Sequence, residues 1–497
     1  IDLGTTSIKS VIFNQKGKRI ASGTCEYRQI IDASDRTVEL DTADLWSTFV
    51  LSIREALKSF RKPASEIISL AVTDQGDTFV PLDEEYRPIG NAITYLDARS
   101  QKESETVTRD LGIDRVFAVT GQPFVSTSYP ATKILWIRDN NPQLFRRTKL
   151  FAPIEDYLVY KLTNVMVCDY SGASMTLMFD IQKKKWWHEI LQYLQIDEDQ
   201  LPELRAPGTS IGDIVQEASK KTRLSSSTTV AAGAHDHTAA AIGAGNIKPG
   251  IVTESTGAVL GLTTTVDKPF FDRKKTILCN CHAVENKYLL LLVGKTGGMV
   301  LRWFRDEFCQ SEMNEAKDKK IEAYDILSYK ASKISPGSDK LIILPHLMGA
   351  GTPENNPKAR GVFFGLTLGH TKAHVARAIM ESVAFMLRRD VELLIDEGMR
   401  LEEIRSIGGG ARSTLWNQIK ADVTQRKVVT PEVEESASLG VGILAGMSAK
   451  MFSSIDDACG TMVHMGGSYV PNQENGKVYN DQFGRYIDLY EHLKDLF

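Results

Sequence analysis

Three short turns, rich in glycine and small polar residues, carry most of the candidate chemistry in this chain. The first spans Asp2–Lys9, where Asp2 ends an apolar segment and Thr5 and Thr6 form a tight turn with a glycine. Turn N–H groups and hydroxyls without partners in a sheet can wrap a phosphate, and Lys9 would add a positive charge. Asp2 could hold a Mg²⁺ ion that bridges phosphates. An ordinary hairpin turn uses the same residue types and stays open as an alternative for this segment alone.

The second and third turns lie far downstream. Glu254-Ser255-Thr256-Gly257 joins two β-rich runs, and Gly408-Gly409-Gly410-Ala411 follows a strand pattern and precedes a helix expected from about Thr414. Consecutive glycines let the backbone approach a flat or anionic ligand and direct helix N–H groups towards it. Taken together, the three turns predict two phosphate-binding hairpins and an adenosine loop, which are the parts of an ATP-binding site.

Asp236 is the candidate catalytic group. It follows an apolar strand pattern, Thr229–Ala232, and precedes a run of small residues, Ala239–Ala244, that predicts a helix. A carboxylate at a helix N-terminus is favoured in its ionised form. It could accept the proton of a substrate hydroxyl that attacks a γ-phosphate, and it is the second candidate Mg²⁺ ligand. The alternative is a plain N-cap role. The flanking His235 and His237 predict packing or substrate-facing groups more readily than metal ligands.

Composition excludes several classes of protein. The chain has 497 residues, which predicts about two domains. Its net charge of −4 provides no basic surplus for nucleic acid or anionic lipid. No long apolar run or secretory signal is visible, so a cytoplasmic protein without membrane contact is expected. The missing initiator Met suggests that a few N-terminal residues are absent.

Cys279-Asn280-Cys281-His282 resembles half of a metal cluster. No second Cys or His pair stands at zinc-finger spacing, so buried free thiols are the favoured interpretation.

The order of predicted elements repeats once along the chain. Strands, a helix and a further strand are expected first over Ile1–Leu3, Ile8–Phe13, Arg19–Tyr27, Asp41–Phe60 and Ile67–Val72, and again over 250–262, His374–Leu394 and Ile404–Ile407. This order predicts an α/β protein of two ribonuclease-H-like domains with an interdomain cleft. The boundary is expected near Ala239–Lys248. Residues 1–243 would hold the acceptor and the first phosphate turn, and residues 244–497 would bind the nucleotide.

Two longer stretches resemble the two signatures of the FGGY family of carbohydrate kinases, within the actin, Hsp70 and sugar kinase superfamily. They are Ser128–Asn140 and Gly361–Leu366 followed by His374–Glu381. The resemblance extends over Glu155–Leu158, Asp169–Ser174 and Glu435–Gly440. It implies two actin-like domains, ATP, a divalent cation such as Mg²⁺, and transfer to a sugar or polyol hydroxyl.

The resemblance also implies roles for single residues. Asp236 matches the general base. The implied nucleotide contacts are Asp2, Thr5, Thr6, Ser255, Thr256, Gly257, Gly409, Gly410, Ala411 and Asn417. The implied acceptor contacts, besides Asp236, are Gln75, Asp77, Asp97 and Arg99.

The acceptor is predicted from charge. Gly76-Asp77 stands where xylulose kinases tend to have Met-His and glycerol kinases Arg-Glu. Carboxylates accept hydrogen bonds from neutral hydroxyls, whereas gluconate would bring its own carboxylate towards Asp77 and Asp97 unless Arg99 faces it. The sequence therefore favours a neutral ketopentose, xylulose first, in a xylulose kinase-like member of the family. Glycerol, gluconate, fuculose, ribulose or another polyol remain alternative acceptors, and a non-kinase actin-like ATPase is the alternative class of protein. A homodimer is the candidate oligomeric state.

Overall fold

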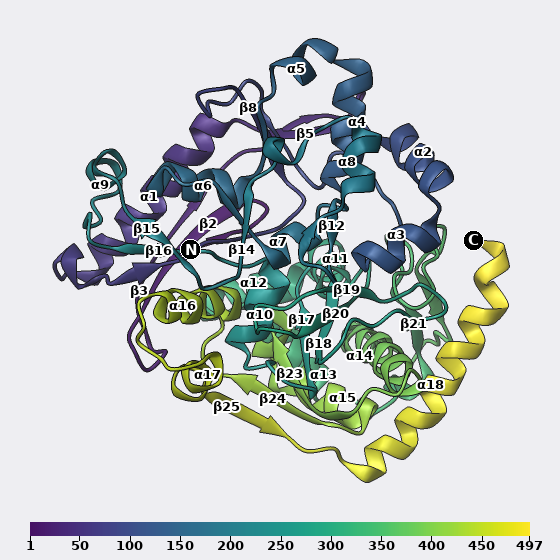
Figure 1. Cartoon of the computed structure of the whole chain (residues 1–497). Coiled ribbons are helices and arrows are strands. Elements are labelled where there is room, and N and C mark those ends of the chain that lie inside the picture. Colours follow the sequence, from purple (N-terminus) through teal and green to yellow (C-terminus); the bar gives the residue numbers. More distant parts are fainter. The chain divides into compact units, whose positions relative to one another are not determined.

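The computed structural model describes all residues, 1–497, and the chain folds into two compact units (Figure 1). Unit 1 comprises residues 1–247, 266–290 and 435–464, and unit 2 comprises residues 248–265, 291–434 and 465–497. Both units mix helices and strands, so the predicted two-domain α/β architecture is confirmed. No helix in the chain combines the length and apolar character needed to cross a membrane.

Unit 1 is built on a sheet with the strand order β3-β2-β1-β7. Its strands are β1 (Asp2–Leu3), β2 (Ser7–Phe13), β3 (Arg19–Glu26) and β7 (Thr73–Asp74). The β1–β2 pair is antiparallel and the β1–β7 pair is parallel. The predicted opening strands are thus confirmed. Of the strand expected over Ile67–Val72, only β6 (Ser69–Leu70) forms, and β7 begins just after that range.

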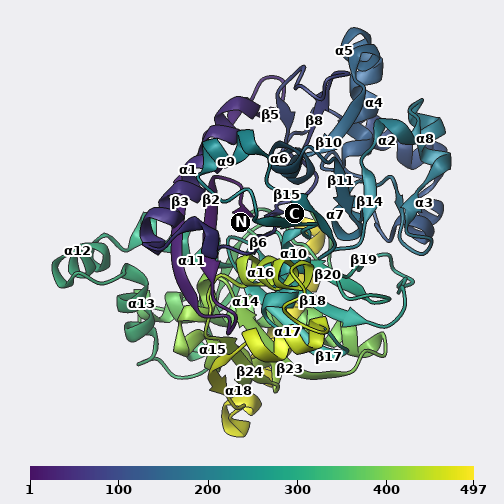
Figure 2. The ribbon, with the colours of Figure 1, turned by 60° about the vertical axis from the view of Figure 1, so that its left-hand side comes forward.

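Helix α1 (Thr42–Phe60) runs beside β2 and β3 in both views (Figures 1 and 2). Asp41 caps it by accepting hydrogen bonds from the N–H groups of Ala43 and Asp44. The buried face of the helix joins one hydrophobic core with both strands of the first hairpin. This core includes Leu3, Ile8, Phe49, Ile53 and Val230.

The remaining parts of unit 1 extend this framework. A second sheet has the order β10-β8-β9-β5-β4, with β4 (Ile30–Asp32), β5 (Thr37–Leu40), β8 (Phe79–Leu82), β9 (Ala92–Ile93) and β10 (Leu150–Pro153). A third has the order β15-β16-β6, with β15 (Ser210–Asp213) and β16 (Thr229–Ala231). The helices of unit 1 include α4 (Pro130–Asn140), α6 (Ile154–Thr163), α7 (Tyr170–Ser174), α10 (Asp236–Gly243), α16 (Ser436–Ser448) and α17 (Ile455–Met462).

Helix α16 belongs to unit 1 although it lies near the C-terminal end of the chain. It crosses α10 so closely that a Cβ at Gly440 would lie 1.8 Å from the carbonyl oxygen of Ala239. A Cβ at Gly243 would lie 1.8 Å from the carbonyl oxygen of Ser436. Only glycine fits at either point, and this backbone contact attaches residues 435–464 to unit 1, an assignment that differs from the expected division at residue 243.

Unit 2 repeats the plan of the first sheet. Its strands follow the order β18-β17-β23-β24-β25, namely β18 (Leu260–Val266), β17 (Gly250–Thr256), β23 (Leu401–Ile407), β24 (Lys427–Pro431) and β25 (Met465–Tyr469). As in unit 1, the first strand pairs antiparallel with its hairpin partner and parallel with a later strand. The main helices are α11 (Gly298–Phe308), α14 (Lys372–Asp396), α15 (Thr414–Thr424) and α18 (Gln473–Leu493).

We predict that Gly440→Ala destabilises unit 1 by about 1–3 kcal/mol, because the added methyl group forces α10 and α16 apart. Thermal unfolding followed by circular dichroism should show a lower Tm. Gly460→Ala is the matched control, since a Cβ there meets nothing within 4 Å and alanine favours the interior of α17. A Tm for Gly440→Ala equal to that of the control would contradict the packing argument.

Candidate active site

The first predicted phosphate turn joins β1 and β2. The Gly4 N–H donates to the Ser7 carbonyl oxygen at 3.0 Å, which closes the turn. The Thr5 hydroxyl lies 3.1 Å from the Tyr95 hydroxyl, and Thr6 is exposed. The turn is therefore held by its backbone, while the Thr6 hydroxyl and the tip remain accessible to an anion.

Asp2 and Lys9 lie opposite each other on this hairpin. Burial, together with the charge of Asp236, raises the pKa of Asp2 to about 6. The Lys9 ammonium lies 3.7 Å from the Glu435 carboxylate, which also pairs with Arg19 at 2.7 Å. Lys9 keeps 38% of its side chain exposed, so its charge is only partly engaged within the protein.

Asp236 is the first residue of α10, and the surrounding backbone is held by two buried hydroxyls. The Thr73 hydroxyl donates to the Ala234 carbonyl oxygen at 2.6 Å, and the Ser171 Oγ accepts from the His235 N–H at 3.0 Å. His235 occupies the N-cap position without a side-chain capping bond. Because the N-cap is His235 and Asp236 lies within the helix, the N-cap alternative for Asp236 is wrong. The Asp236 Oδ1 is buried and takes part in no hydrogen bond.

The ring of His235 connects Asp236 to the loop that follows β7. His235 Nε2 lies 3.3 Å from Asp236 Oδ1, and a Cβ at Gly76 would lie 2.6 Å from the His235 ring. Burial lowers the pKa of His235 to about 4, so the ring is neutral at pH 7. The imidazole thus packs between Asp236 and the loop without adding a charge. Gly76 is suited to this place by its lack of a side chain and its φ of +73°.

Gln75 and Asp77, on either side of Gly76, hold unused hydrogen-bonding capacity. The Gln75 Oε1 and the Asp77 Oδ1 are buried and have no hydrogen-bond partner. Asp77 also adopts a left-handed backbone conformation, with φ of 55°. Burial raises the pKa of Asp77 well above its usual range, and the charge of Lys133 opposes this rise. Buried acceptors without donors are costly, which points to a ligand that supplies hydroxyl or amine hydrogens.

Asp74, Asp169 and Glu155 form a cluster of buried carboxyl groups that was not predicted, and the charge of Asp236 acts on Asp74. Burial raises the pKa of Asp74 to about 7 and that of Asp169 to about 6, and it raises the pKa of Glu155 well above its usual range. Asp169 also accepts a hydrogen bond from the Ser171 hydroxyl at 2.5 Å. It thereby orients the hydroxyl oxygen that accepts from the His235 N–H. The motif Asp169–Ser174 was visible in the sequence, but its contact with the backbone of His235 was not.

No three histidine, cysteine or acidic side chains gather closely enough to hold a metal ion by themselves. This arrangement is compatible with Mg²⁺, which commonly takes one or two protein carboxylates and fills its remaining positions with phosphate oxygens and water. Asp2 and Asp236 suit that role because their negative charges oppose each other in a buried setting, which a cation would relieve.

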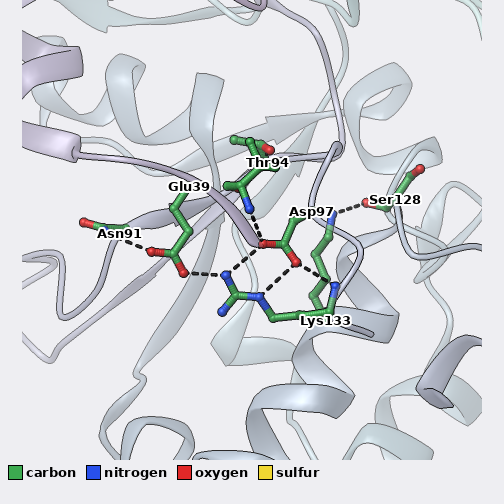
Figure 3. A network of polar contacts seen from close by, with 8 residues as sticks. Glu39, Asn91, Thr94, Asp97, Ser128 and Lys133 are labelled. Carbon is green, nitrogen blue, oxygen red and sulfur yellow. Dashed lines mark hydrogen bonds and ion pairs between the residues drawn. The ribbon is translucent and has the colours of Figure 1, made fainter. Parts of the chain in front are cut away.

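Asp97 and Arg99 have partners inside the protein (Figure 3). The fully buried Asp97 accepts a hydrogen bond from the Val38 N–H at 2.8 Å, and both of its oxygens accept from Arg99. The Arg99 guanidinium also pairs with Glu39 and lies 5.0 Å over the ring of Trp136. These two predicted acceptor contacts therefore have far less free hydrogen-bonding capacity than Gln75 and Asp77.

The two predicted nucleotide turns of unit 2 lie against each other. A Cβ at Gly408 would lie 3.1 Å from the Ser255 Oγ, and a Cβ at Gly410 would lie 2.6 Å from the Cβ of Thr256. Gly408 also has φ of +75°, which a side chain would disfavour. Gly257 and Gly409 are exposed at the tips of their turns. Asn417, fully buried below, donates to the Ala411 carbonyl oxygen at 2.7 Å.

Glu254 anchors this arrangement from beneath, a role that was not predicted. Its buried carboxylate pairs with Lys420 at 2.7 Å. It also accepts hydrogen bonds from the hydroxyl of Ser406, at 2.7 Å, and from that of Thr256. Burial lowers the pKa of Lys420, and the charge of Glu254 opposes that effect. Because the Thr256 hydroxyl donates to Glu254, the backbone of the turn and the Ser255 hydroxyl are the groups left for a ligand.

The segment around Cys279 is buried in unit 1. Burial raises the pKa of Cys279 and Cys281 to about 12, so both thiols are protonated at neutral pH. Both ring nitrogens of His282 contact backbone groups, the Asn246 carbonyl oxygen at 3.1 Å and the Val284 N–H at 2.9 Å. These side chains take part in packing and local hydrogen bonds.

Comparison with known families and proteins agrees with this geometry. Residues 1–243 match the N-terminal domain of the FGGY family of carbohydrate kinases, and residues 256–449 match its C-terminal domain. Across its whole length the chain is 28% identical to xylulose kinase of Bacillus subtilis (strain 168), covering 97% of that protein. It is 31% identical to gluconokinase of Bacillus licheniformis, again over the whole chain and 96% of the relative.

Solved structures show the same similarity. Ligand-bound xylulose kinase from Lactobacillus acidophilus matches with a TM-score of 0.88 at 25% identity, over 99% of this chain and 97% of that structure. Gluconate kinase from the same organism matches with a TM-score of 0.88 at 26% identity and the same coverage. The chain belongs to the FGGY family of carbohydrate kinases and is a phosphotransferase that uses an alcohol group as acceptor.

Proposed function

We propose that this kinase transfers the γ-phosphoryl group of ATP to a hydroxyl of a small neutral sugar, most readily a ketopentose such as xylulose. The observation that carries the proposal is the set of buried, unpartnered oxygens on Gln75, Asp77 and Asp236. Each can accept a hydrogen bond, and a polyhydroxylated acceptor supplies several donors at short spacing. The relatives named xylulose kinase support this choice.

Each unit is proposed to supply nucleotide contacts. In unit 2, Ser255, Thr256 and Gly257 would face phosphate, and Gly409, Gly410 and Ala411, supported by Asn417, would face adenosine. The close contact of these two turns supports a shared ligand. In unit 1, Thr5, Thr6 and Lys9 would hold phosphate oxygens. A bound Mg²⁺, held by Asp2 and Asp236, would neutralise phosphate charge during transfer.

Asp236 is proposed as the general base. The acceptor oxygen attacks the γ-phosphorus as its proton passes to the Asp236 carboxylate. The bond from that phosphorus to the bridging oxygen breaks, and the electron pair leaves with ADP. Thr73 and Ser171 support this role because they hold the backbone before Asp236, so that its Oδ1 need not take part in a hydrogen bond. Catalysis would then depend mainly on positioning.

Gluconate is the second candidate acceptor. Two gluconokinases are 31% identical to the whole chain, slightly above the 28% of the Bacillus subtilis xylulose kinase. The buried Lys133 also provides a positive charge near Asp77. A panel of xylulose, ribulose, fuculose, glycerol and gluconate, with ATP alone as control and ADP release as readout, tests both candidates. A preference for gluconate with inert xylulose would overturn the neutral-acceptor proposal.

We predict that Asp236→Asn lowers kcat by about 10²–10⁴-fold, because asparagine preserves the shape of the side chain but cannot take the proton. The Tm should change little, since the Asp236 Oδ1 takes part in no hydrogen bond. Asp35→Asn, at an exposed position of unit 1, is the matched control and should retain full activity. Near-normal turnover by Asp236→Asn would remove Asp236 from the role of base.

We predict that Asp2→Ala raises the Mg²⁺ concentration needed for half-maximal activity by at least about 10-fold, because the metal loses a protein carboxylate. The measurement is a Mg²⁺ titration of ADP release at saturating ATP and acceptor. A parallel measurement of Tm identifies any loss of folding. An unchanged Mg²⁺ requirement in a folded Asp2→Ala variant would argue against a metal role for Asp2.

A further inference from the structure

We infer that Lys133 is an acceptor-binding residue, which donates hydrogen bonds to the end of the sugar remote from the reacting hydroxyl. The inference rests on the proposed function, because it assigns a further contact within the same acceptor site. Lys133 was part of the first sequence signature, but nothing in its local pattern distinguished it from a structural helix residue.

The Lys133 ammonium is fully buried and has unused donors. Lys133 lies in the first turn of α4, and its side chain is 0% exposed. Its Nζ donates to the Ser128 carbonyl oxygen at 2.5 Å (Figure 3). An ammonium has three N–H donors, and no carboxylate lies within the 4.0 Å of an ion pair. A buried charge in a folded protein is normally paired, so a partner is missing from this site.

Asp77 provides the matching hydrogen-bond acceptor that has no partner. Its charge acts on Lys133 more strongly than that of Asp97 or Arg99, and its Oδ1 is buried without a donor. Asp97 cannot serve in its place, because both of its oxygens already accept hydrogen bonds from Arg99 (Figure 3). A hydroxyl bound between Lys133 and Asp77 would satisfy both groups, since it accepts from the ammonium and donates to the carboxylate.

The charges also indicate the order of these groups. Asp236 raises the pKa of both Asp2 and Asp77. Asp77 is also the charged group that acts most strongly on Lys133. Asp77 therefore interacts with both the proposed base and Lys133, and the inference places it between them. With the reacting hydroxyl of a ketopentose at Asp236, the opposite end of the sugar would reach Lys133.

Protonation of Lys133 gives the inference a pH signature. Burial lowers the pKa of Lys133 to about 7, with Asp77 and Asp97 opposing the shift and Arg99 reinforcing it. The ammonium is present below that pKa and lost above it. Acceptor kcat/KM in the wild type should therefore decline as the pH rises through about 7, while the KM for ATP should not follow the same limb.

We predict that Lys133→Met lowers kcat/KM for xylulose by about 10–100-fold and leaves the KM for ATP within about 3-fold, the loss expected for a hydrogen bond to a charged group. The decisive comparison uses 1-deoxyxylulose, which lacks the remote hydroxyl. The wild type should discriminate against this analogue by a similar factor, and Lys133→Met should use both sugars equally well. The pH limb near 7 should disappear in the variant.

Lys161→Met is the matched control. Lys161 is a partly buried lysine of α6 in the same unit, and burial also lowers its pKa. Its removal should leave the discrimination between the two sugars unchanged. Lys133→Gln, which keeps a donor without the charge, provides a second variant if Lys133→Met fails to fold, and it should retain part of the discrimination. Where the panel selects another acceptor, the analogue lacking the hydroxyl farthest from the phosphorylated carbon takes the place of 1-deoxyxylulose.

The outcomes separate the two proposals. A wild type that phosphorylates no sugar of the panel contradicts the proposed function. An active wild type whose Lys133 variants keep the normal acceptor KM and the normal discrimination overturns the inference. A lowered Tm with unchanged discrimination likewise overturns it, because Lys133 would then only support α4.

Discussion

The proposed role of Asp236 as general base sets one constraint on unit 1: the backbone, rather than the Asp236 Oδ1, must hold this residue in place. An aspartate that accepts hydrogen bonds from the protein is a weaker base than a free one, because those bonds stabilise its ionised form. The structure meets this constraint through the backbone. Thr73 holds the Ala234 carbonyl and Ser171 holds the His235 N–H, while the Asp236 Oδ1 takes part in no hydrogen bond.

The proposed binding groups of the two units differ in kind. In unit 2 the carboxylate beneath the Ser255–Gly257 turn is satisfied, since Glu254 has partners on Lys420, Ser406 and Thr256. A satisfied buried network rigidifies its surroundings, and it leaves the backbone of the glycine turns as the proposed binding surface. In unit 1 the Gln75 Oε1 and the Asp77 Oδ1 are buried without a hydrogen-bond partner. That arrangement suits an acceptor that must be recognised by its individual hydroxyls, because each one completes a hydrogen bond that the protein leaves open.

Acceptor choice depends on which of the buried charges are already paired. Arg99 is held by Asp97 and Glu39, so it cannot turn towards a ligand without leaving two carboxylates exposed to each other. Lys133, by contrast, is buried with a single carbonyl partner. Lys133, rather than Arg99, is therefore the positive charge that a bound acceptor would meet under the proposed function. A cation opposite Asp77 still favours a hydroxyl that can bridge the two.

The sequence alone determined the features that depend on neighbours along the chain. Turn chemistry and apolar periodicity act over a few residues. They predict the β1–β2 turn, the strand before Asp236 and the glycine loop after β23. The two family signatures added the fold and the reaction class, and the matches to both family domains confirm them.

Only the tertiary structure decided which distant groups meet. Residues 435–464 join unit 1 because Gly440 and Gly243 permit a backbone contact between α10 and α16 that no local pattern reports. The carboxyl cluster around Asp236, the Glu254–Lys420 pair and the engagement of Arg99 likewise join segments far apart in the chain. A residue type states what a side chain can donate or accept, but burial and long-range packing decide whether that capacity is spent within the protein or left for a ligand.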